Sequence, residues 1–184
     1  MTRIVGGTLG GRRLVTPPGS STRPTAEKVR AALANSLQAT GGLDGARVLD
    51  LYAGSGALGL ELVSRGASTA VFVEKDRAAL AALRSNVALV AQGVTVVAAD
   101  VLAYLGTDGI GPYDAVVADP PYDLAADDLV AVLSRLTRAS ALAAHADVII
   151  ECGVKAGEPA WPEPLTGVRV RRYGDTLLCY GRAP

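Results

Sequence analysis

Short apolar runs alternate with segments of helical periodicity over residues 47–151. Each run has the length of a strand, and the segments between the runs repeat apolar residues every three or four positions, as on one face of a helix. We expect five strands, at Arg47–Leu51, Thr69–Glu74, Val94–Ala98, Ala115–Ala118 and Asp147–Glu151. Helices are predicted after the first strand, from Asp76 to about Val90, and from Ala126 to Arg138. The alternation predicts an α/β, Rossmann-like fold of βαβ units around a mostly parallel sheet.

The two ends of the chain follow other patterns. Residues 3–15 read as two short strands joined by the glycine-rich segment GTLGG, and a helix capped by Thr25 is expected to begin after Pro24 and to run through Gln38. Near the C-terminus, VRVRRYGDTLLCYG has the two-residue period of strands and turns at Gly174-Asp175, which predicts an antiparallel hairpin. We therefore expect a hairpin-and-helix extension over residues 1–40 and a main domain over residues 41–184.

Composition narrows the class of protein. The 184 residues are 49% hydrophobic and 20% charged, and no apolar run approaches the roughly 20 residues that a membrane-spanning helix needs. The first residues lack the apolar core of a signal peptide. The two cysteines and the single histidine do not have the spacing of metal ligands. We expect a soluble, cytoplasmic monomer that binds no metal and no membrane.

Charge is balanced over the chain but not along it. Residues 1–30 carry six basic side chains and one acidic one, although the whole chain has a formal net charge of zero. A second basic group lies near the C-terminus, at Arg169, Arg171, Arg172 and Arg182. Two basic ends on a neutral protein indicate that one side binds a polyanion. Within the first group, Arg3, Arg12 and Arg13 lie on the predicted hairpin and are the candidate residues for binding the polyanion, as RNA-binding residues if the polyanion is RNA.

The first strand of the main domain runs into a glycine-rich turn, in the sequence VLDLYAGSGALG over residues 48–59. Glycines at Gly54, Gly56 and Gly59 let a ligand approach the backbone where a helix begins with unpaired N–H groups. GSGALG also fits the dinucleotide-binding pattern G-x-G-x-x-G, and Glu74 lies where the ribose-binding acid of that pattern belongs. A plain strand-to-helix turn is a third reading of the same residues.

Acidic residues fall at the carboxyl ends of four consecutive predicted strands. They are Asp50, Glu74, Asp100 and Asp119. In an open parallel sheet these ends border one crevice, which is where ligands of such folds bind. A single aspartate after a strand, such as Asp100, is also a common helix cap. Taken together, the acids favour a cofactor with a cationic sulfonium over a dinucleotide, whose pyrophosphate is negative.

The fourth of these strands ends in Asp119-Pro120-Pro121-Tyr122. An exocyclic amine on a nucleobase is a poor nucleophile, because its lone pair is delocalised into the ring. Two acceptors can take hydrogen bonds from the two amine hydrogens: the Asp119 carboxylate and a backbone carbonyl that the rigid Pro120-Pro121 pair holds in place. Tyr122 offers a flat face on which a base turned out of its stack can rest.

These motifs resemble those of class I methyltransferases that use S-adenosylmethionine: DLYAGSGALG is similar to their first motif and DPPY to their amino-directed (D/N)PP(Y/F) motif. Over almost the whole chain, including the segments GRRLVTP, RPTAEKVR and a terminal Tyr180-Gly181, the sequence resembles the bacterial family that methylates N2 of guanine 966 in 16S ribosomal RNA. The resemblance implies S-adenosylmethionine as cofactor and small-subunit 16S ribosomal RNA as partner.

The resemblance also implies roles for individual residues. Gly54 and Gly56 would border the methionine part of the cofactor, with Asp50 nearby. Glu74 would bind the ribose hydroxyls and Asp100 the adenine amine. Arg23 and Thr25 would lie over the cofactor pocket.

Two alternatives stay open at this point. DPPY does not distinguish guanine N2 from adenine N6, so an amino methyltransferase acting on adenine in DNA or RNA fits the same motif. A methyltransferase fold that only binds RNA is the second alternative, although the intact Asp119 and Tyr122 disfavour it.

Overall fold

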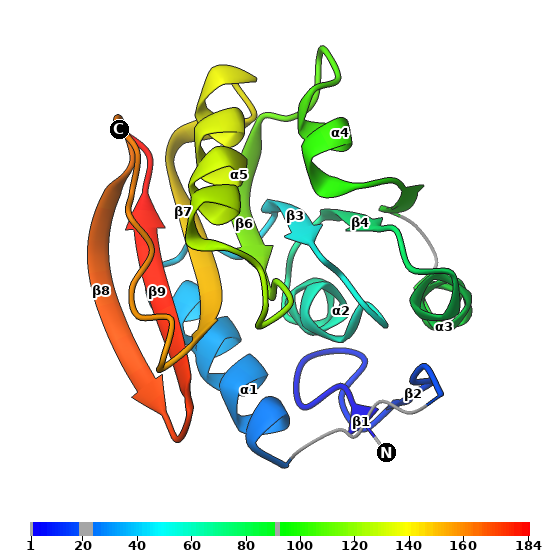
Figure 1. Cartoon of the computed structure of the whole chain (residues 1–184). Coiled ribbons are helices and arrows are strands. Elements are labelled where there is room, and N and C mark those ends of the chain that lie inside the picture. The colour runs from blue at the N-terminus through cyan, green and yellow to red at the C-terminus, as the bar shows by residue number, and fades with distance from the viewer. Residues whose placement is uncertain (1, 19–23, 91–92) are drawn as a thin grey trace.

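The computed structural model describes residues 2–18, 24–90 and 93–184. Its helices are α1 (Pro24–Ala39), α2 (Ala57–Ser64), α3 (Arg77–Val87), α4 (Val101–Leu105) and α5 (Ala126–Arg138). Its strands are β1 (Thr2–Arg3), β2 (Arg13–Leu14), β3 (Arg47–Leu51), β4 (Thr69–Glu74), β5 (Val94–Ala98), β6 (Tyr113–Ala118), β7 (Leu142–Gly153), β8 (Thr166–Tyr173) and β9 (Thr176–Arg182). Figure 1 shows their arrangement.

A seven-stranded sheet in the order β5-β4-β3-β6-β7-β9-β8 forms the centre of the molecule (Figure 1). The strands from β5 to β7 are parallel, and β9 and β8 follow as an antiparallel hairpin. The chain moves outward from β3 to β4 and β5, then returns to place β6 on the other side of β3. Such a reversal opens a crevice at the carboxyl ends of the two strands on either side of it.

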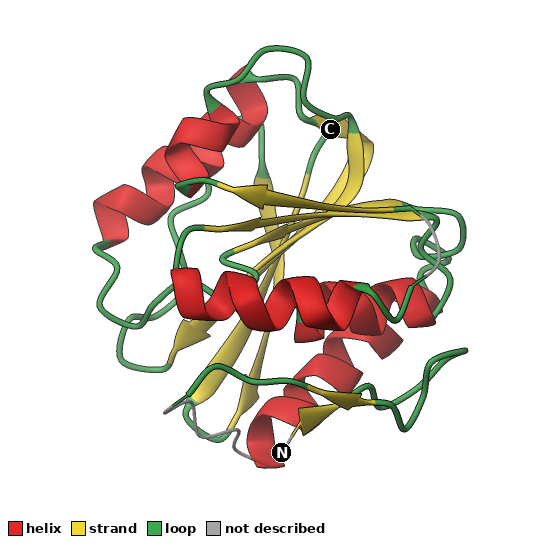
Figure 2. Ribbon diagram, turned by 90° about the vertical axis from the view of Figure 1, so that its right-hand side faces the viewer, coloured by secondary structure: helices red, strands yellow, loops and turns green. Residues whose placement is uncertain are grey.

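Helices cover both faces of this sheet (Figure 2). On one face, α1, α2 and α3 pack against alternate strand residues such as Val48, Phe72 and Val117. On the other face, α4 and α5 pack against the intervening residues, such as Leu49, Val73 and Val116. The central parallel strands β3 and β6 are therefore buried on both sides, which explains why they read as nearly continuous apolar runs. No helix in the described ranges is both long enough and apolar enough to cross a bilayer.

The N-terminal hairpin of β1 and β2 is fastened to the main domain by Glu61 of α2. This side chain is fully buried, and its carboxylate accepts hydrogen bonds from the backbone N–H groups of Val5 (2.6 Å) and Gly6 (3.0 Å). It also pairs with Arg65 at 2.6 Å. Ile4 and Leu14 belong to the same apolar core as α1 and the sheet. The division into residues 1–40 and 41–184 stays a prediction, and the two parts share one core.

Two elements differ most from the pattern-based expectation, while β6 begins two residues early, at Tyr113, and α3 ends at Val87. Helix α4 was not predicted; it is only five residues long and follows Asp100 directly. Strand β7 begins at Leu142, five residues before the expected Asp147, and includes an alanine-rich stretch around His145 that resembles a helix in sequence. His145 has a φ of 59°, and its N–H bonds to the Pro184 carbonyl at 2.9 Å. Pairing with the end of the chain thus outweighs the local helical preference.

Candidate active site

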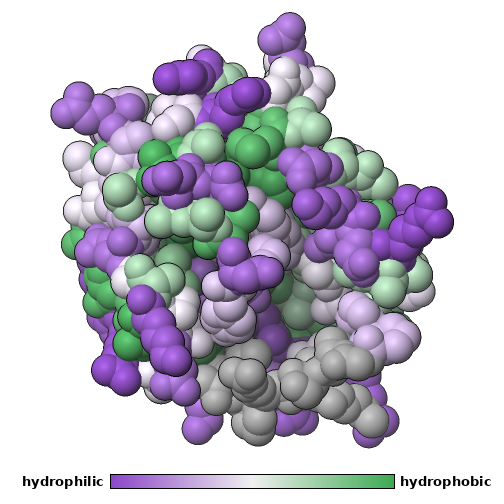
Figure 3. Space-filling model, viewed as in Figure 1, coloured by the Kyte–Doolittle hydropathy of each residue, from purple (hydrophilic) through white to green (hydrophobic). Residues whose placement is uncertain are grey.

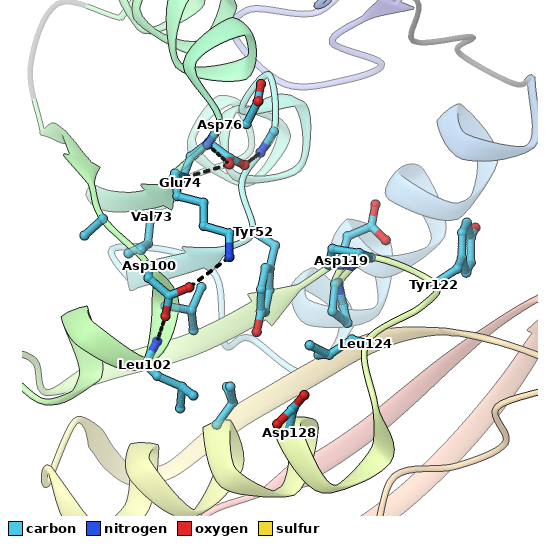
Figure 4. A pocket seen from close by; sticks show the side chains of 17 residues that line it. Tyr52, Val73, Glu74, Asp76, Asp100, Leu102, Asp119, Tyr122, Leu124 and Asp128 are labelled. Carbon is cyan, nitrogen blue, oxygen red and sulfur yellow. Dashed lines mark hydrogen bonds and ion pairs between the residues drawn. The ribbon is translucent and has the colours of Figure 1, made fainter.

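A cavity of about 640 Å³ lies at the carboxyl ends of β3, β4, β5 and β6 (Figure 4). The predicted residues Gly54, Glu74, Asp100, Asp119, Pro120 and Tyr122 all line it. Tyr52 and, from α5, Asp128 line it as well. In the space-filling view, this side of the molecule is hollowed and bordered by both apolar and polar side chains (Figure 3). The fold therefore brings together residues that are up to 80 positions apart, from Tyr52 to Val132.

The glycine-rich turn is held in shape by Glu74. One oxygen of this carboxylate accepts the N–H of Gly54 at 2.8 Å, and the other accepts the N–H groups of Lys75 (2.7 Å) and Asp76 (2.8 Å). Gly54 and Gly56 have φ values of 56° and 79°, and a Cβ on Gly56 would come within 2.4 Å of Leu83 Cδ1. A side chain at Gly56 would meet both backbone strain and a filled core.

Asp50 lies beneath the turn instead of on the cavity wall. It is 1% exposed, and its carboxyl accepts the N–H of Gly59 at 2.8 Å. Burial raises the pKa of Asp50 to about 8, partly offset by that hydrogen bond. Gly56 is also absent from the lining of the cavity. The structure thus places these two predicted cofactor residues where they shape the turn from below.

Asp100 is a helix cap and a cavity residue at the same time. One of its oxygens accepts the N–H of Leu102 at 2.9 Å at the start of α4, and the other pairs with Lys75 Nζ at 3.0 Å. The hydrogen bond from Lys75 lowers the pKa of Asp100. The capping alternative raised by the sequence is therefore confirmed, and it leaves the carboxylate facing the cavity.

Negative charge dominates the cavity wall. Among the described residues, Lys75 is the one cationic side chain of the lining, against the carboxylates of Glu74, Asp76, Asp100, Asp119 and Asp128. A cleft lined by one sign of charge concentrates ligands of the other sign. The wall is therefore suited to a cationic nucleoside ligand that carries hydroxyl and amine donors. It is unsuited to the pyrophosphate of a dinucleotide.

Asp119 and Tyr122 occupy the opposite side of the cavity from Asp100 (Figure 4). The Asp119 side chain lines the cavity. Desolvation by the surrounding protein raises the pKa of Asp119 to about 6, and the positive charge of Arg30 opposes this shift. Pro120 is buried, whereas Tyr122 is 67% exposed. A Cβ on Gly153, at the end of β7, would be 3.4 Å from the Tyr122 ring. The ring therefore lies next to the strand at Gly153, with much of its surface open.

Residues 2–182 match the protein family described as conserved hypothetical protein 95. The chain is 37% identical over 161 residues to ribosomal RNA small subunit methyltransferase D of Escherichia coli, covering 87% of this chain and 79% of that relative. The chain belongs to the family of ribosomal RNA small subunit methyltransferase D. The predicted family is thereby confirmed.

Solved structures confirm the fold of this methyltransferase D family member. The Escherichia coli protein yhhF superposes with a TM-score of 0.86 at 32% identity, over 98% of this chain and 97% of that one. Magnesium protoporphyrin IX methyltransferase from Synechocystis, solved with bound SAM, superposes with a TM-score of 0.68 at 17% identity, over 90% and 87%. The second likeness shows that the predicted class I methyltransferase fold is correct.

Arg30 is a site residue of this family member that sequence reasoning did not single out. It is 8% exposed and donates hydrogen bonds to Thr2 Oγ1 (2.9 Å) and to the Arg3 carbonyl (3.2 Å). Burial lowers the pKa of Arg30, whereas the nearby carboxylates, Asp119 and Glu151 among them, raise it. Only its position in a basic segment marked it in the sequence.

Asn86 of α3 was also missed. It is buried, and its amide oxygen accepts the Val15 N–H at 2.8 Å, while its amide nitrogen donates to the carbonyls of Val15 (2.9 Å) and Ser55 (2.8 Å). One side chain therefore joins the N-terminal extension to the glycine-rich turn. An asparagine in a predicted helix carries no sequence signal of such a role.

The predicted RNA-binding arginines lie on or beside the N-terminal hairpin. Arg3, Arg12 and Arg13 are exposed, and Arg3 lies 3.8 Å from Glu27. Their position leaves them available to a polyanion. Arg23 lies outside the described residues, and Thr25 lies in the first turn of α1 without a described side chain. The predicted placement of those two residues over the pocket stays a prediction.

Proposed function

We propose that this chain transfers a methyl group from S-adenosylmethionine to the exocyclic N2 of a guanine in small-subunit 16S ribosomal RNA, at guanine 966. The observation that carries the proposal is the DPPY segment at the end of β6, next to an acid-lined cavity, in a member of the methyltransferase D family. The name of the Escherichia coli relative supports ribosomal RNA of the small subunit as the substrate class.

The residues present fit S-adenosylmethionine. When bound, this cofactor supplies an electrophilic methyl group on a cationic sulfonium. Glu74 would accept hydrogen bonds from the ribose hydroxyls and Asp100 from the adenine amine, since both carboxylates face the cavity. Gly54 would let the ligand approach the backbone. The excess of carboxylates on the wall would favour the positive charge of the ligand.

Asp119 would orient the target amine. With a pKa near 6 its carboxyl group is mainly ionised at neutral pH, so it can accept a hydrogen bond from the amine. The buried Pro120 fixes the backbone that carries it. Tyr122 would stack on the flipped base through its exposed face. Alignment of two bound reactants can contribute about 7–11 kcal/mol to lowering a barrier.

The exposed arginines of the hairpin would bind RNA phosphates. Arg3, Arg12 and Arg13 lie in the same N-terminal segment whose backbone Arg30 anchors, and Arg30 is close enough to Asp119 to influence its charge. Phosphate contacts from such a hairpin would position the RNA, while the site selects the base.

The test is transfer of labelled methyl to small subunits that lack the modification, followed by nucleoside analysis. We expect label only in N2-methylguanosine, at one position of 16S ribosomal RNA. Label in N6-methyladenosine would refute the guanine assignment but keep the mechanism. Absence of label, with cofactor binding intact, would favour a fold that only binds RNA.

An Asp119→Ala variant separates chemistry from binding. Loss of the acceptor should reduce transfer at least 100-fold, because the amine is no longer oriented. Cofactor affinity, measured by titration calorimetry, should stay within about tenfold of the unsubstituted protein. Retained turnover would remove Asp119 from the mechanism.

A further inference from the structure

Glu151 lies beside Asp119 at the carboxyl end of the sheet. Strands β6 and β7 are parallel and pair Ala118 with Ile150, so the next residue on each strand is one of these two acids. Glu151 is half-buried. It shares a strand face with Ile149, whose side chain packs in the core on the α1 side of the sheet. Two carboxyl groups are thus neighbours at the site of the DPPY motif.

Tyr122 lies against the same strand. Gly153 is two residues beyond Glu151 and therefore on the same face of β7. The Tyr122 ring lies next to Gly153 on this face. In Figure 4 the Asp119 carboxylate points toward the side where Tyr122 and α1 lie, away from Asp100. A base stacked on Tyr122 would therefore have its edge directed toward two carboxyl groups instead of one.

A buried cation completes this group. Arg30 of α1 is more than nine-tenths buried, and among the described residues its Nε has no hydrogen-bond partner. Its charge acts on both Asp119 and Glu151. Burial and Asp119 raise the pKa of Glu151 to about 8, and Arg30 opposes them. Placing two acids side by side in a partly buried position costs desolvation energy, and the positive charge of Arg30 offsets part of it. Two adjacent acceptors of this kind are suited to a ligand with two adjacent hydrogen-bond donors.

Guanine has such an edge. Its N1–H and its N2 amine are neighbouring donors, whereas adenine presents its N6 amine beside N1, which is an acceptor. Protonated or ionised, a carboxyl group keeps an oxygen that can accept. We propose that Glu151 is a specificity-determining residue, which accepts the N1–H of the target guanine while Asp119 accepts from its N2 amine. The proposal rests on the proposed function and deepens it.

The test compares two target bases that both carry the N2 amine. Small subunits are reconstituted from 16S ribosomal RNA with either guanine or 2-aminopurine at the target position, introduced by splinted ligation. 2-Aminopurine lacks the N1–H. Transfer is measured for the unsubstituted protein, Glu151→Gln, Glu151→Leu and the control Glu163→Gln, which changes an exposed glutamate in the loop between β7 and β8. Titration calorimetry with S-adenosylmethionine and thermal unfolding are measured in parallel.

In assays above pH 8, where the Glu151 carboxylate is ionised and can only accept, we expect the unsubstituted protein and Glu163→Gln to prefer guanine over 2-aminopurine by about 10- to 100-fold in kcat/KM, as for loss of a hydrogen bond to a charged group. Glu151→Leu should be slow on both bases and lose that preference. Glu151→Gln can turn either its oxygen or its NH₂ toward N1, so it should act on both bases at similar rates. Cofactor affinity should change less than threefold in every variant.

Several outcomes would overturn the inference. Equal rates of the unsubstituted protein on guanine and 2-aminopurine would show that N1–H is not read. A guanine preference that persists in Glu151→Gln would assign the reading to another residue, and this comparison stands even if Glu151→Leu does not fold. No transfer by the unsubstituted protein to guanine subunits would refute the proposed function itself, and the two failures are therefore distinguishable.

Discussion

Replacing Glu74 by glutamine should weaken cofactor binding more than the similar shapes of the two side chains suggest. In the structure both carboxylate oxygens accept backbone N–H groups, one from Gly54 and the other from Lys75 and Asp76. A glutamine amide has only one oxygen, so its NH₂ must face an N–H donor at one of these two places. Turning the NH₂ toward Gly54 sacrifices one hydrogen bond instead of two, and we expect this orientation.

The magnitude follows from two losses. The Gly54 N–H at the glycine-rich turn loses its acceptor, and a charged acceptor for the ribose hydroxyls becomes a neutral donor. Loss of a hydrogen bond to a charged group costs about 1.5–3 kcal/mol, which corresponds to roughly 10- to 150-fold in affinity. We therefore expect Glu74→Gln to bind S-adenosylmethionine at least tenfold more weakly.

Titration calorimetry with S-adenosylhomocysteine and its 2′-deoxy analogue distinguishes the two losses. The unsubstituted protein should bind the deoxy analogue more weakly, whereas Glu74→Gln should bind both ligands alike, because its ribose acceptor is already lost. The exposed Glu163→Gln serves as a control with the same change of charge. If Glu74→Gln still discriminated between the ligands as the unsubstituted protein does, Glu74 would hold only the turn.

Three further predictions concern stability and RNA. Asn86→Ala should lower the free energy of unfolding, measured in urea, by about 2–4 kcal/mol, because three hydrogen bonds to backbone groups are lost. The control Ser85→Ala, at an exposed neighbouring residue, should change it by less than about 0.5 kcal/mol. Equal effects of the two substitutions would contradict the bridging role of Asn86. Replacing Arg12 and Arg13 by alanine should weaken RNA binding and flatten its salt dependence, and an unchanged slope would place them away from RNA. Burial raises the pKa of Asp50 in the folded protein to about 8, whereas in the unfolded chain Asp50 loses its proton near pH 4. Between these two pH values the folded protein binds one more proton than the unfolded chain. The free energy of unfolding should therefore fall as pH rises, by up to about 1.4 kcal/mol per pH unit. Asp50→Asn, which keeps an oxygen for the Gly59 N–H, should show a smaller fall; identical pH profiles would mean that Asp50 is ionised in the folded protein.

Local pattern was sufficient for most elements of the fold. The bounds of β3, β4, β5 and α5 match the prediction, and the C-terminal hairpin turns at Gly174-Asp175. These elements have a strong period and clear turn residues, so neighbouring positions specify them. Helix α4 is too short for a period to be visible, and the early part of β7 depends on pairing with residues from β6 and the end of the chain.

The candidate site was predictable where it depends on topology. Glu74, Asp100 and Asp119 line one cavity because the carboxyl ends of parallel strands meet at one edge. Asp50 lies one residue before the end of β3, and its side chain is directed under the turn that the strand enters. Arg30 and Asn86 could not be found in this way, since their partners lie 27 to 71 positions away in the sequence.

The carboxylates at this end of the sheet divide according to what they bind. Glu74 and Asp50 accept backbone N–H groups and so fix the turn, which leaves the cofactor side of the cavity preformed. Asp119 and Glu151 instead share the influence of Arg30, and Arg30 also donates to the backbone of Arg3 in the N-terminal hairpin. If RNA phosphates contact that hairpin as proposed, the contact would act on the residue that compensates Asp119 and Glu151. A shift of Arg30 would change the charge balance at Asp119, and we expect binding of the RNA backbone to influence recognition of the base through this buried side chain.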